Sequence, residues 1–351
     1  MKETKRYIVI FFSVTFLGML FVAGVTFIID PFFQYHMPWF NGEPNVYDER
    51  YQNPGLAKNY EYDAIITGSS MSENFNASWF DTAYNINTIK LTYSGASMKD
   101  VENAITMATN NRDVKYVFSN IDMEMLSQEF GKETTYIPEY LYDNNFFNDV
   151  KYLLNKEVLF ENTYKAYIGL VNKYEGNIKN AYAWYERKKE EFEGDKVVNS
   201  VGWGGLHPQD IDYDVDNNTK RVVASLKEII KNNKNTTFVF FYSPYSILMY
   251  YKYINSGSIG GLLGAYKYSM SELLECENVQ LYFPTTEKII SDLDSYKDLG
   301  HYDLEIQYLI FEQIRDGKNR LTIDNYEKYM DSFEEMVLTY DYKALIDKYT
   351  N

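Results

Sequence analysis

The sequence predicts an α/β protein with a mainly parallel, five-stranded sheet, preceded by one transmembrane helix. Three observations lead to this prediction: an uncharged apolar stretch at the N-terminus, short apolar runs that alternate with helical patterns after residue 60, and turn residues where these runs end. Apolar strands separated by helices are typical of parallel sheets covered on both faces. With 351 residues, the chain is long enough to form one large domain with additions.

The N-terminal stretch, residues 7–29, contains no charged side chain and is rich in Phe, Val, Ile and Leu. It is long enough to cross a bilayer as a helix, and longer than the core of a typical signal peptide. A cleaved signal peptide and a buried core helix are the alternatives. Because Lys2, Lys5 and Arg6 precede the stretch, the positive-inside rule places the N-terminus in the cytoplasm and the main domain outside the plasma membrane.

Composition excludes several classes of function. The formal net charge is −16 and no basic patch stands out, so we expect no nucleic-acid partner. The single cysteine, Cys276, excludes an internal disulfide and any cysteine-based metal site. An extracytoplasmic domain without disulfides favours a bacterial surface protein. The three histidines, His36, His207 and His301, are scattered without metal-ligand spacing, so we expect neither a metal nor another cofactor.

The domain bounds are predicted from changes in these patterns. We expect a cytoplasmic tail at residues 1–6, a transmembrane anchor at 7–29 and a juxtamembrane connector at 30–58. An α/β domain at 59–320 and a C-terminal helical extension at 321–351 are expected to follow. Residues 140–200 interrupt the alternation and predict a helical insertion near the carboxyl edge of the sheet, beside a substrate cleft. Aromatic residues at 32–40 are typical of the headgroup level of a membrane, and Asn53-Pro54-Gly55 predicts a break before the folded domain.

Within the α/β domain, the strands are expected at residues 64–67, 84–94, 116–121, 236–242 and 279–283. Helices are expected at 98–108, 219–231 and 304–314, and Ser97 with Asp100 forms a capping-box pattern before the first of these. In parallel sheets, functional groups gather at the carboxyl ends of the strands. Polar and glycine residues stand at these ends: Gly68-Ser69-Ser70, Gly95, Asn120, Asp122 and Ser243-Pro244.

The first of these strand ends carries a candidate nucleophile. Gly68-Ser69-Ser70 follows an apolar strand and precedes polar residues that can open a helix. A serine at a helix N-terminus suits attack on a carbonyl, because converging N–H groups and the helix dipole favour developing negative charge. A βα turn with a serine N-cap is the alternative.

A nucleophilic serine requires a base, and histidine is the usual one. His301 follows Asp298 by three residues beyond the last strand. This spacing can place Asp298 against one ring nitrogen while the other faces Ser70, as in a Ser-His-Asp triad. An ordinary polar loop with a helix cap is the alternative. His207 lies in a glycine-rich loop, near Asp210, and its role stays open.

These blocks, in this order, resemble those of the SGNH/GDSL hydrolase superfamily. The Gly-Ser-Ser form and the N-terminal anchor are similar to its extracytoplasmic branches that act on cell-surface polymers, including the DltD-like and AlgJ-like proteins. The resemblance covers residues 60–316 through short motifs. It implies a three-layer αβα, flavodoxin-like fold with Ser70 as nucleophile, His301 as base and Asp298 as the residue that orients the base. It also implies an oxyanion hole built from the backbone N–H groups of Ser70 and Gly95 and an asparagine side chain.

The sequence departs from the superfamily pattern at two places. The usual Gly-x-Asn-Asp of the third block is absent; Ser119-Asn120-Ile121-Asp122 stands near its place, which makes Asn120 the candidate third oxyanion donor. The first block has Gly-Ser-Ser in place of Gly-Asp-Ser, which leaves Ser69 as a rival for Ser70. Losing one oxyanion donor costs on the order of 10²–10³ in turnover, so the third block bears on activity.

The expected function is that of a membrane-anchored serine esterase or O-acyltransferase outside the cell. It would act through an acyl-Ser70 intermediate on acyl groups of a surface polysaccharide or teichoic-type polymer, and a membrane acyltransferase is an open candidate partner. The alternative is a non-catalytic carbohydrate-binding or assembly subunit of a surface-polymer export system. The altered third block favours this alternative, and the set Ser70, Asp298 and His301 argues against it.

Overall fold

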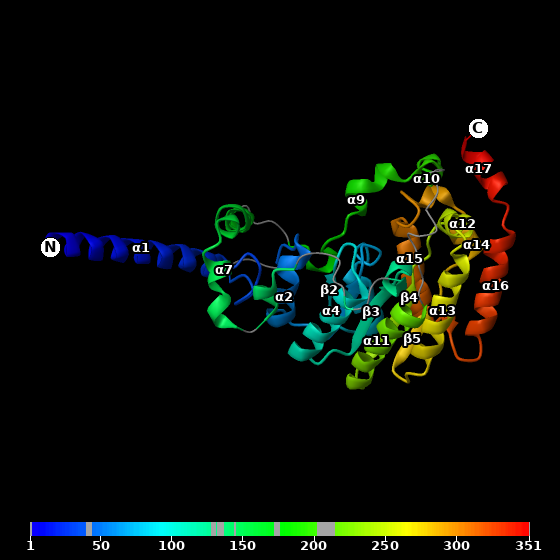
Figure 1. Cartoon of the computed structure of the whole chain (residues 1–351), viewed down its shortest axis with the longest axis horizontal. Helices are drawn as coiled ribbons and strands as arrows, with labels where there is room; N and C mark the ends of the chain where they lie inside the picture. The colour runs from blue at the N-terminus through cyan, green and yellow to red at the C-terminus, as the bar shows by residue number, and fades with distance from the viewer. Residues whose placement is uncertain are drawn as a thin grey trace. The chain divides into compact units, whose positions relative to one another are not determined.

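The computed structural model of the chain (Figure 1) describes residues 2–39, 44–127, 131, 137–143, 145–171, 176–201 and 215–350. The chain forms two compact units: unit 1 comprises Met1–Glu61 with Tyr136–Ala181, and unit 2 comprises Tyr62–Thr135 with Tyr182–Asn351. The helical insertion expected at residues 140–200 is thus divided between the units at residue 181. His207 and Asp210 lie outside the described residues.

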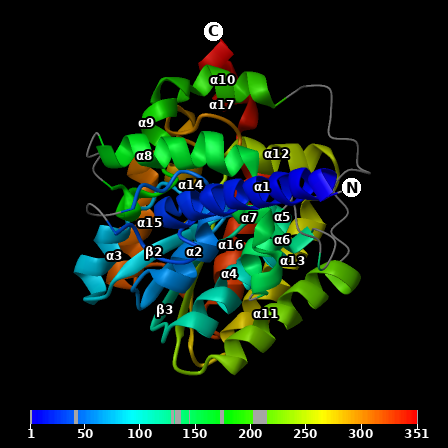
Figure 2. The same cartoon turned by 90° about the vertical axis from the view of Figure 1, so that its left-hand side faces the viewer.

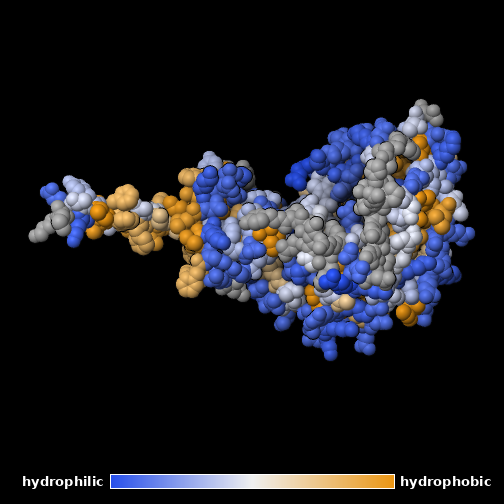
Figure 3. All heavy atoms as spheres, in the orientation of Figure 1, coloured by the Kyte–Doolittle hydropathy of each residue, from blue (hydrophilic) through white to orange (hydrophobic). Residues whose placement is uncertain are grey.

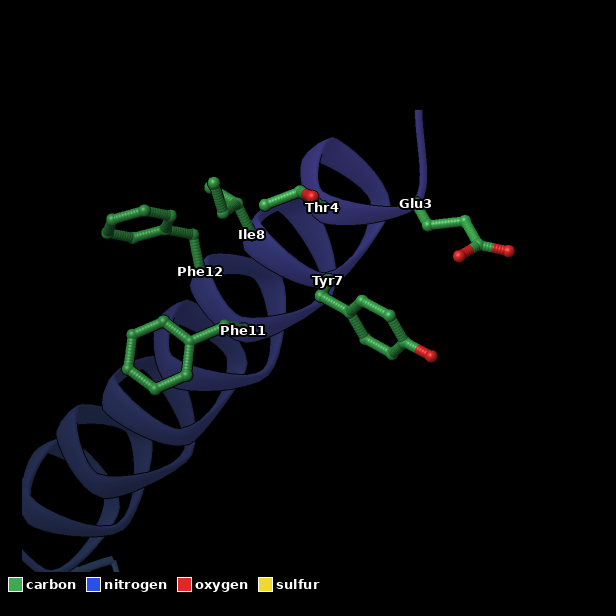
Figure 4. Close-up of a pocket in the computed structure, with 6 residues that line it drawn as sticks. All are labelled: Glu3, Thr4, Tyr7, Ile8, Phe11 and Phe12. Atoms are coloured by element: carbon green, nitrogen blue, oxygen red, sulfur yellow. The ribbon is translucent and has the colours of Figure 1, made fainter. Parts of the chain in front are cut away.

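Unit 1 begins with the long helix α1 (Lys2–Ile29). Its stretch Glu3–Ile29 is long and apolar enough to cross a membrane, and its most apolar window is not buried inside the protein. At 1.5 Å per residue this stretch measures about 40 Å, more than the ~30 Å hydrocarbon core of a bilayer. Figure 3 shows apolar surface along the helix with a hydrophilic N-terminal end, and Figure 4 shows Phe11 and Phe12 projecting outward from it.

The second helix, α2 (Glu49–Asn59), contains Asn53-Pro54-Gly55, so the chain break predicted there is wrong. The helix begins at Asp48, whose side chain accepts a hydrogen bond from the Tyr51 N–H. A Cβ atom on Gly55 would lie 2.0 Å from the carbonyl oxygen of Phe32. Gly55 therefore permits a close approach between α2 and the chain that follows α1.

The aromatic connector after α1 folds into the core of unit 1. Phe32 and Phe33 are buried, and Phe32 packs in a cluster with Leu141, Tyr152 and Val158. The buried Asp30 carboxylate accepts hydrogen bonds from the Tyr152 hydroxyl and from the backbone N–H groups of residues 34–36. These two phenylalanines therefore pack against protein, in contrast to the expected place at the headgroup level. The other elements of unit 1 are α6 (Glu139–Tyr142), η1 (Phe146–Asn148), α7 (Val150–Leu153), η2 (Val158–Thr163), α8 (Tyr164–Val171) and η3 (Ile178–Asn180).

Unit 2 contains a six-stranded sheet in the order β2-β1-β3-β4-β5-β6. The strands are β1 (Ala64–Gly68), β2 (Thr88–Thr92), β3 (Tyr116–Ile121), β4 (Thr237–Tyr242), β5 (Val279–Tyr282) and β6 (Arg320–Leu321). The first five pair in parallel, which confirms a mainly parallel α/β sheet. The expected number of five is wrong, because β6 pairs antiparallel with β5. Two residues are too few to produce a recognisable alternating pattern.

Helices of unit 2 lie on both faces of the sheet (Figure 2). On one face, α11 (Lys220–Asn232) contacts α4 (Met98–Asn111) and α13 (Ile259–Leu274); on the other, α3 (Ala77–Tyr84) contacts α15 (Leu304–Asp316). The predicted capping box of Ser97 and Asp100 is confirmed at the start of α4. The remaining elements are α5 (Met123–Ser127), α9 (Tyr185–Lys188), η4 (Lys189–Glu191), α10 (Gly194–Ser200), η5 (Val215–Thr219), α12 (Ile247–Asn255), α14 (Glu287–Ile290), η6 (Leu293–Ser295), α16 (Tyr326–Thr339) and α17 (Tyr342–Thr350).

A buried lysine links β2 to the turn that follows β1. Lys90, in the middle of β2, is fully buried, and its Nζ donates a hydrogen bond to the carbonyl oxygen of Glu73 at 2.6 Å. Burial lowers the pKa of Lys90 to about 7, although the Glu73 charge opposes this shift. Because Glu73 belongs to the turn that carries Ser70, Lys90 helps to hold that turn against the sheet.

The pKa of Lys90 predicts a pH dependence of stability. Between pH 7 and about 10.4, the unfolded state binds a proton at Lys90 that the folded state has lost, so the free energy of unfolding rises with pH. Below pH 7 both states are protonated and this contribution is constant. We expect a rise of about 2–3 kcal/mol between pH 7 and pH 9 in the wild type that is absent in Lys90→Met, measured by denaturant unfolding of the full chain in detergent. Parallel pH profiles of the two proteins would contradict the assignment.

Candidate active site

The turn after β1 presents Ser70 at the carboxyl edge of the sheet. Residues 69–74 form successive turns, in which the N–H of Ser72 donates to the Ser69 oxygen and the N–H of Glu73 to the Ser70 oxygen. The helix expected to begin there is absent, because the next helix, α3, starts only at Ala77. Ser70 therefore does not stand at a helix N-terminus, and this part of the sequence prediction is wrong.

Gly68 makes the geometry of this turn possible. Its φ is +119°, and an added Cβ would lie 1.9 Å from the Asn120 Oδ1 atom. That oxygen accepts hydrogen bonds from the Ser69 N–H at 3.0 Å and from the Ser72 hydroxyl at 2.7 Å. The absence of a side chain at Gly68 lets Asn120 hold both ends of the Ser69–Ser72 turn.

Ser70, His301 and Asp298 form a continuous chain of hydrogen bonds. Ser70 Oγ lies 2.9 Å from His301 Nε2, and His301 Nδ1 lies 2.8 Å from Asp298 Oδ2. An ionised Asp298 accepts a hydrogen bond from the protonated Nδ1 of His301. The unprotonated Nε2 can then accept a hydrogen bond from the Ser70 hydroxyl. This is the arrangement of nucleophile, base and orienting carboxylate expected from the sequence.

The Asp298 carboxylate is fixed by the loop that also carries His301. Its Oδ1 accepts hydrogen bonds from the backbone N–H groups of Gly300 at 2.9 Å and of His301 at 2.8 Å. Burial acts to raise the pKa of Asp298, but the contacts with His301 and these N–H donors outweigh it and hold the pKa well below its usual range. The carboxylate thus stays ionised and keeps the imidazole in one orientation.

A buried polar network underlies the triad and uses the side chains of Ser69 and Asn120. Ser69 Oγ donates to Asp122, and the Ser243 hydroxyl donates to the other Asp122 oxygen at 2.6 Å. The Asn120 Nδ2 donates to Ser69 Oγ at 3.1 Å and to Ser243 Oγ at 3.4 Å. Ser69 therefore lies in a structural network, whereas the Ser70 hydroxyl lies within hydrogen-bond distance of His301.

The Asn120 side chain is not positioned to donate a hydrogen bond to an oxyanion at Ser70, in contrast to the expectation from the sequence. It is fully buried, and both its oxygen and its nitrogen bind groups inside the network. The other two expected donors lie at the same sheet edge. Gly95, with φ +66°, is exposed in the loop after β2, and the Tyr93 N–H of that loop binds the Gly68 oxygen. The Ser70 N–H has no acceptor among the residues that the structure describes.

Trp184 is a further residue of the site, and no pattern in the sequence marked it. Its indole Nε1 donates to the carbonyl oxygen of Ser70 at 3.1 Å, and its ring stands edge-on to His301, with ring centroids 5.4 Å apart. Asn74 Oδ1 accepts hydrogen bonds from the backbone N–H groups of Trp184 and Tyr185. These two bonds hold the start of α9 against the turn that carries Ser70. The part of the expected insertion that belongs to unit 2 therefore forms one wall of the triad.

Lys297 adds a positive charge to this wall. Its Nζ lies 4.9 Å from the centroid of the Trp184 ring and 3.7 Å from Asp298 Oδ2. In the described part of the chain, no group of three or more His, Cys, Asp or Glu side chains is arranged to hold a metal ion. His36 makes its ring contacts within unit 1, where its nitrogens lie 2.8 Å from the Met37 oxygen and 2.9 Å from the Phe27 oxygen.

Comparisons with protein-family models, with curated proteins and with solved structures found no match to this chain. The function is therefore inferred from the geometry of the site.

Proposed function

We propose that this protein is a membrane-anchored serine esterase or O-acyltransferase of the SGNH type. The hydrogen-bond chain Ser70–His301–Asp298 carries the proposal. The order of the first five strands, β2-β1-β3-β4-β5, is that of flavodoxin-like sheets and supports a three-layer αβα fold. In such folds the ligand binds outside the carboxyl ends of the strands, where Ser70 lies.

The proposed reaction has two steps. Ser70 Oγ attacks the ester carbonyl while His301 Nε2 takes its proton, and His301 then gives that proton to the departing alcohol as the acyl-Ser70 ester forms. Water or a sugar hydroxyl next attacks the acyl-enzyme, with His301 again as base, and Ser70 recovers its proton. Water makes the protein an esterase, and a sugar hydroxyl makes it a transferase. The N–H groups of Ser70 and Gly95 are the proposed oxyanion donors.

The proposed substrate is an acylated polysaccharide or teichoic-type polymer at the bacterial cell surface. Support comes from α1, which has the length of a membrane span, and from the cations that precede its apolar part. This charge pattern favours a cytoplasmic N-terminus and an extracellular unit 2. A membrane acyltransferase that supplies the acyl group is the proposed partner for the transfer reaction.

A non-catalytic binding or assembly subunit is the second candidate, and the position of Asn120 favours it. The amide group that would complete the oxyanion hole is engaged with Ser69 and Ser243. Because one such donor contributes on the order of 10²–10³ to turnover, its loss lowers the activity that the site can reach.

Labelling with a fluorophosphonate probe distinguishes the two candidates, because the probe reacts with activated serines. We expect the full chain in membranes to take the label, Ser70→Ala to lose it, and Ser332→Ala, at an exposed position on α16, to keep it. A folded wild-type protein that takes no label would contradict an activated Ser70 and favour the binding subunit.

A further inference from the structure

Unit 1 carries an apolar groove beside α1 that the proposed catalytic reaction does not use. The groove has a volume of about 520 Å³, within the range of small-molecule sites. One wall is the C-terminal part of α1, from Phe21 to Ile29, and the other is formed by η2 and α8, through Leu159, Phe160, Thr163, Tyr164 and Tyr167.

Large aromatic side chains at this groove are exposed. Phe160, Tyr164 and Tyr167 are 73%, 61% and 51% exposed, and Phe21 on the opposite wall is 73% exposed. Figure 3 shows apolar surface reaching the end of α1 that joins the rest of unit 1. Exposed apolar surface gathered in one place marks an interaction site.

The segment formed by η2 and α8 has a second, charged face. Glu157, Glu161 and Lys165, spaced four residues apart, are exposed and do not line the groove. A helix with aromatic residues on one face and charges on the other is typical of helices that lie in the membrane interface.

The position of the groove along α1 indicates what fills it. The charged residues before Tyr7 fix one membrane surface, and about 20 residues at 1.5 Å each carry α1 across the ~30 Å hydrocarbon core to Thr26. Residues 21–26 therefore lie in the outer part of the hydrocarbon core on the far side, and residues 27–29 reach the boundary with the headgroups. A groove at this depth opens to lipid.

We propose that η2 and α8 form a second membrane contact of this protein, with a lipid acyl chain in the groove against α1. The aromatic face lies at the boundary between acyl chains and headgroups, and the charged face points to water. Thr163 Oγ1 is buried at the groove without a hydrogen-bond partner in the described part of the chain. At this depth it can donate to a lipid ester carbonyl. The inference rests on α1 crossing the bilayer and is independent of the triad.

Site-specific fluorescence quenching tests this contact. The full chain, with the buried Cys276 replaced by alanine, receives a single cysteine in Phe160→Cys or in the matched control Glu161→Cys, and is labelled with an environment-sensitive dye. Each protein is reconstituted into phosphatidylcholine vesicles that contain lipids with a nitroxide at acyl carbon ~5 or ~12, near or far from the headgroup boundary. Phe12→Cys, within the apolar part of α1, serves as the reference for the hydrocarbon core.

We expect the dye at position 160 to be quenched at least ~2-fold more than the dye at 161, and more by the shallow nitroxide than by the deep one. The dye at position 12 should show the opposite preference for depth. Equal and weak lipid quenching at 160 and 161, with strong quenching by aqueous iodide, would show that the groove faces water and overturn the proposal. Protection at 160 from both lipid nitroxides and iodide would assign the groove to a protein segment instead. A dye at position 12 that no lipid quenches would remove the premise that α1 crosses the bilayer.

Discussion

Ser70→Ala is expected to lower ester hydrolysis by on the order of 10³–10⁶-fold, because the hydroxyl proposed to form the acyl-enzyme is lost. Hydrolysis of a simple nitrophenyl ester by the full chain measures the effect. The free energy of unfolding should change by less than about 0.5 kcal/mol, since Ser70 is half-buried and its Oγ forms a hydrogen bond only with His301 among the described residues.

A double variant provides a sharper test of the triad. If Ser70 and His301 act as one unit, His301→Ala should cost about as much as Ser70→Ala, and the double variant should be no slower than either. Independent roles would instead give losses that multiply. Loss of folding in both single variants, with no separate effect on turnover, would assign the two residues to structure.

The juxtaposition of Ser70, His301 and Asp298 could be predicted from the sequence because each residue stands at a strand end or in a short loop with a fixed spacing. Parallel strands bring their carboxyl ends to one edge, so Ser70 after β1 and the Asp298–His301 loop after β5 share that edge. The three-residue spacing limited how far Asp298 can be from the His301 ring.

The direction of a buried amide could not be predicted in this way. The sequence places Asn120 at the correct strand end, but only the surrounding hydroxyl groups of Ser69, Ser72 and Ser243 decide where its amide points. The same contacts explain why no helix starts at Ser70, because they hold residues 69–72 in a turn. These interactions join β1, β3 and β4, which are far apart in the sequence.

The position of Trp184 beside Ser70 could not be predicted from the sequence either. This residue is separated from Ser70 by 114 residues and belongs to a segment whose helical pattern gives no indication of which side chain reaches the site. The hydrogen bonds that the backbone N–H groups of Trp184 and Tyr185 donate to Asn74 Oδ1 decide its position. Likewise, the break expected at Asn53-Pro54-Gly55 follows from local propensity, which the close packing of Gly55 against Phe32 overrides.

Gly68→Ala is expected to destabilise the protein by about 2–6 kcal/mol and to abolish labelling of Ser70. About 1–3 kcal/mol comes from a side chain at φ +119°, and a similar amount from overpacking against Asn120. Asn120 cannot turn away at low cost, because its side chain makes hydrogen bonds to three serine residues. Denaturant unfolding of the full chain measures the loss.

Two matched variants separate the steric term from the backbone term. Gly95→Ala also places a side chain at positive φ, but no atom lies within 4 Å of the added Cβ, so only about 1–2 kcal/mol should be lost. In an Asn120→Ala background the clash with the Asn120 side chain disappears, and the Ser72 Oγ, 2.9 Å from the added Cβ, loses its Asn120 acceptor and can rotate. Gly68→Ala should then cost only the backbone contribution of about 1–3 kcal/mol. An unchanged cost of Gly68→Ala in that background would show that backbone strain, rather than Asn120, fixes the glycine. In either case Gly68 sets the position of Ser70, since the turn that carries this serine begins after Gly68.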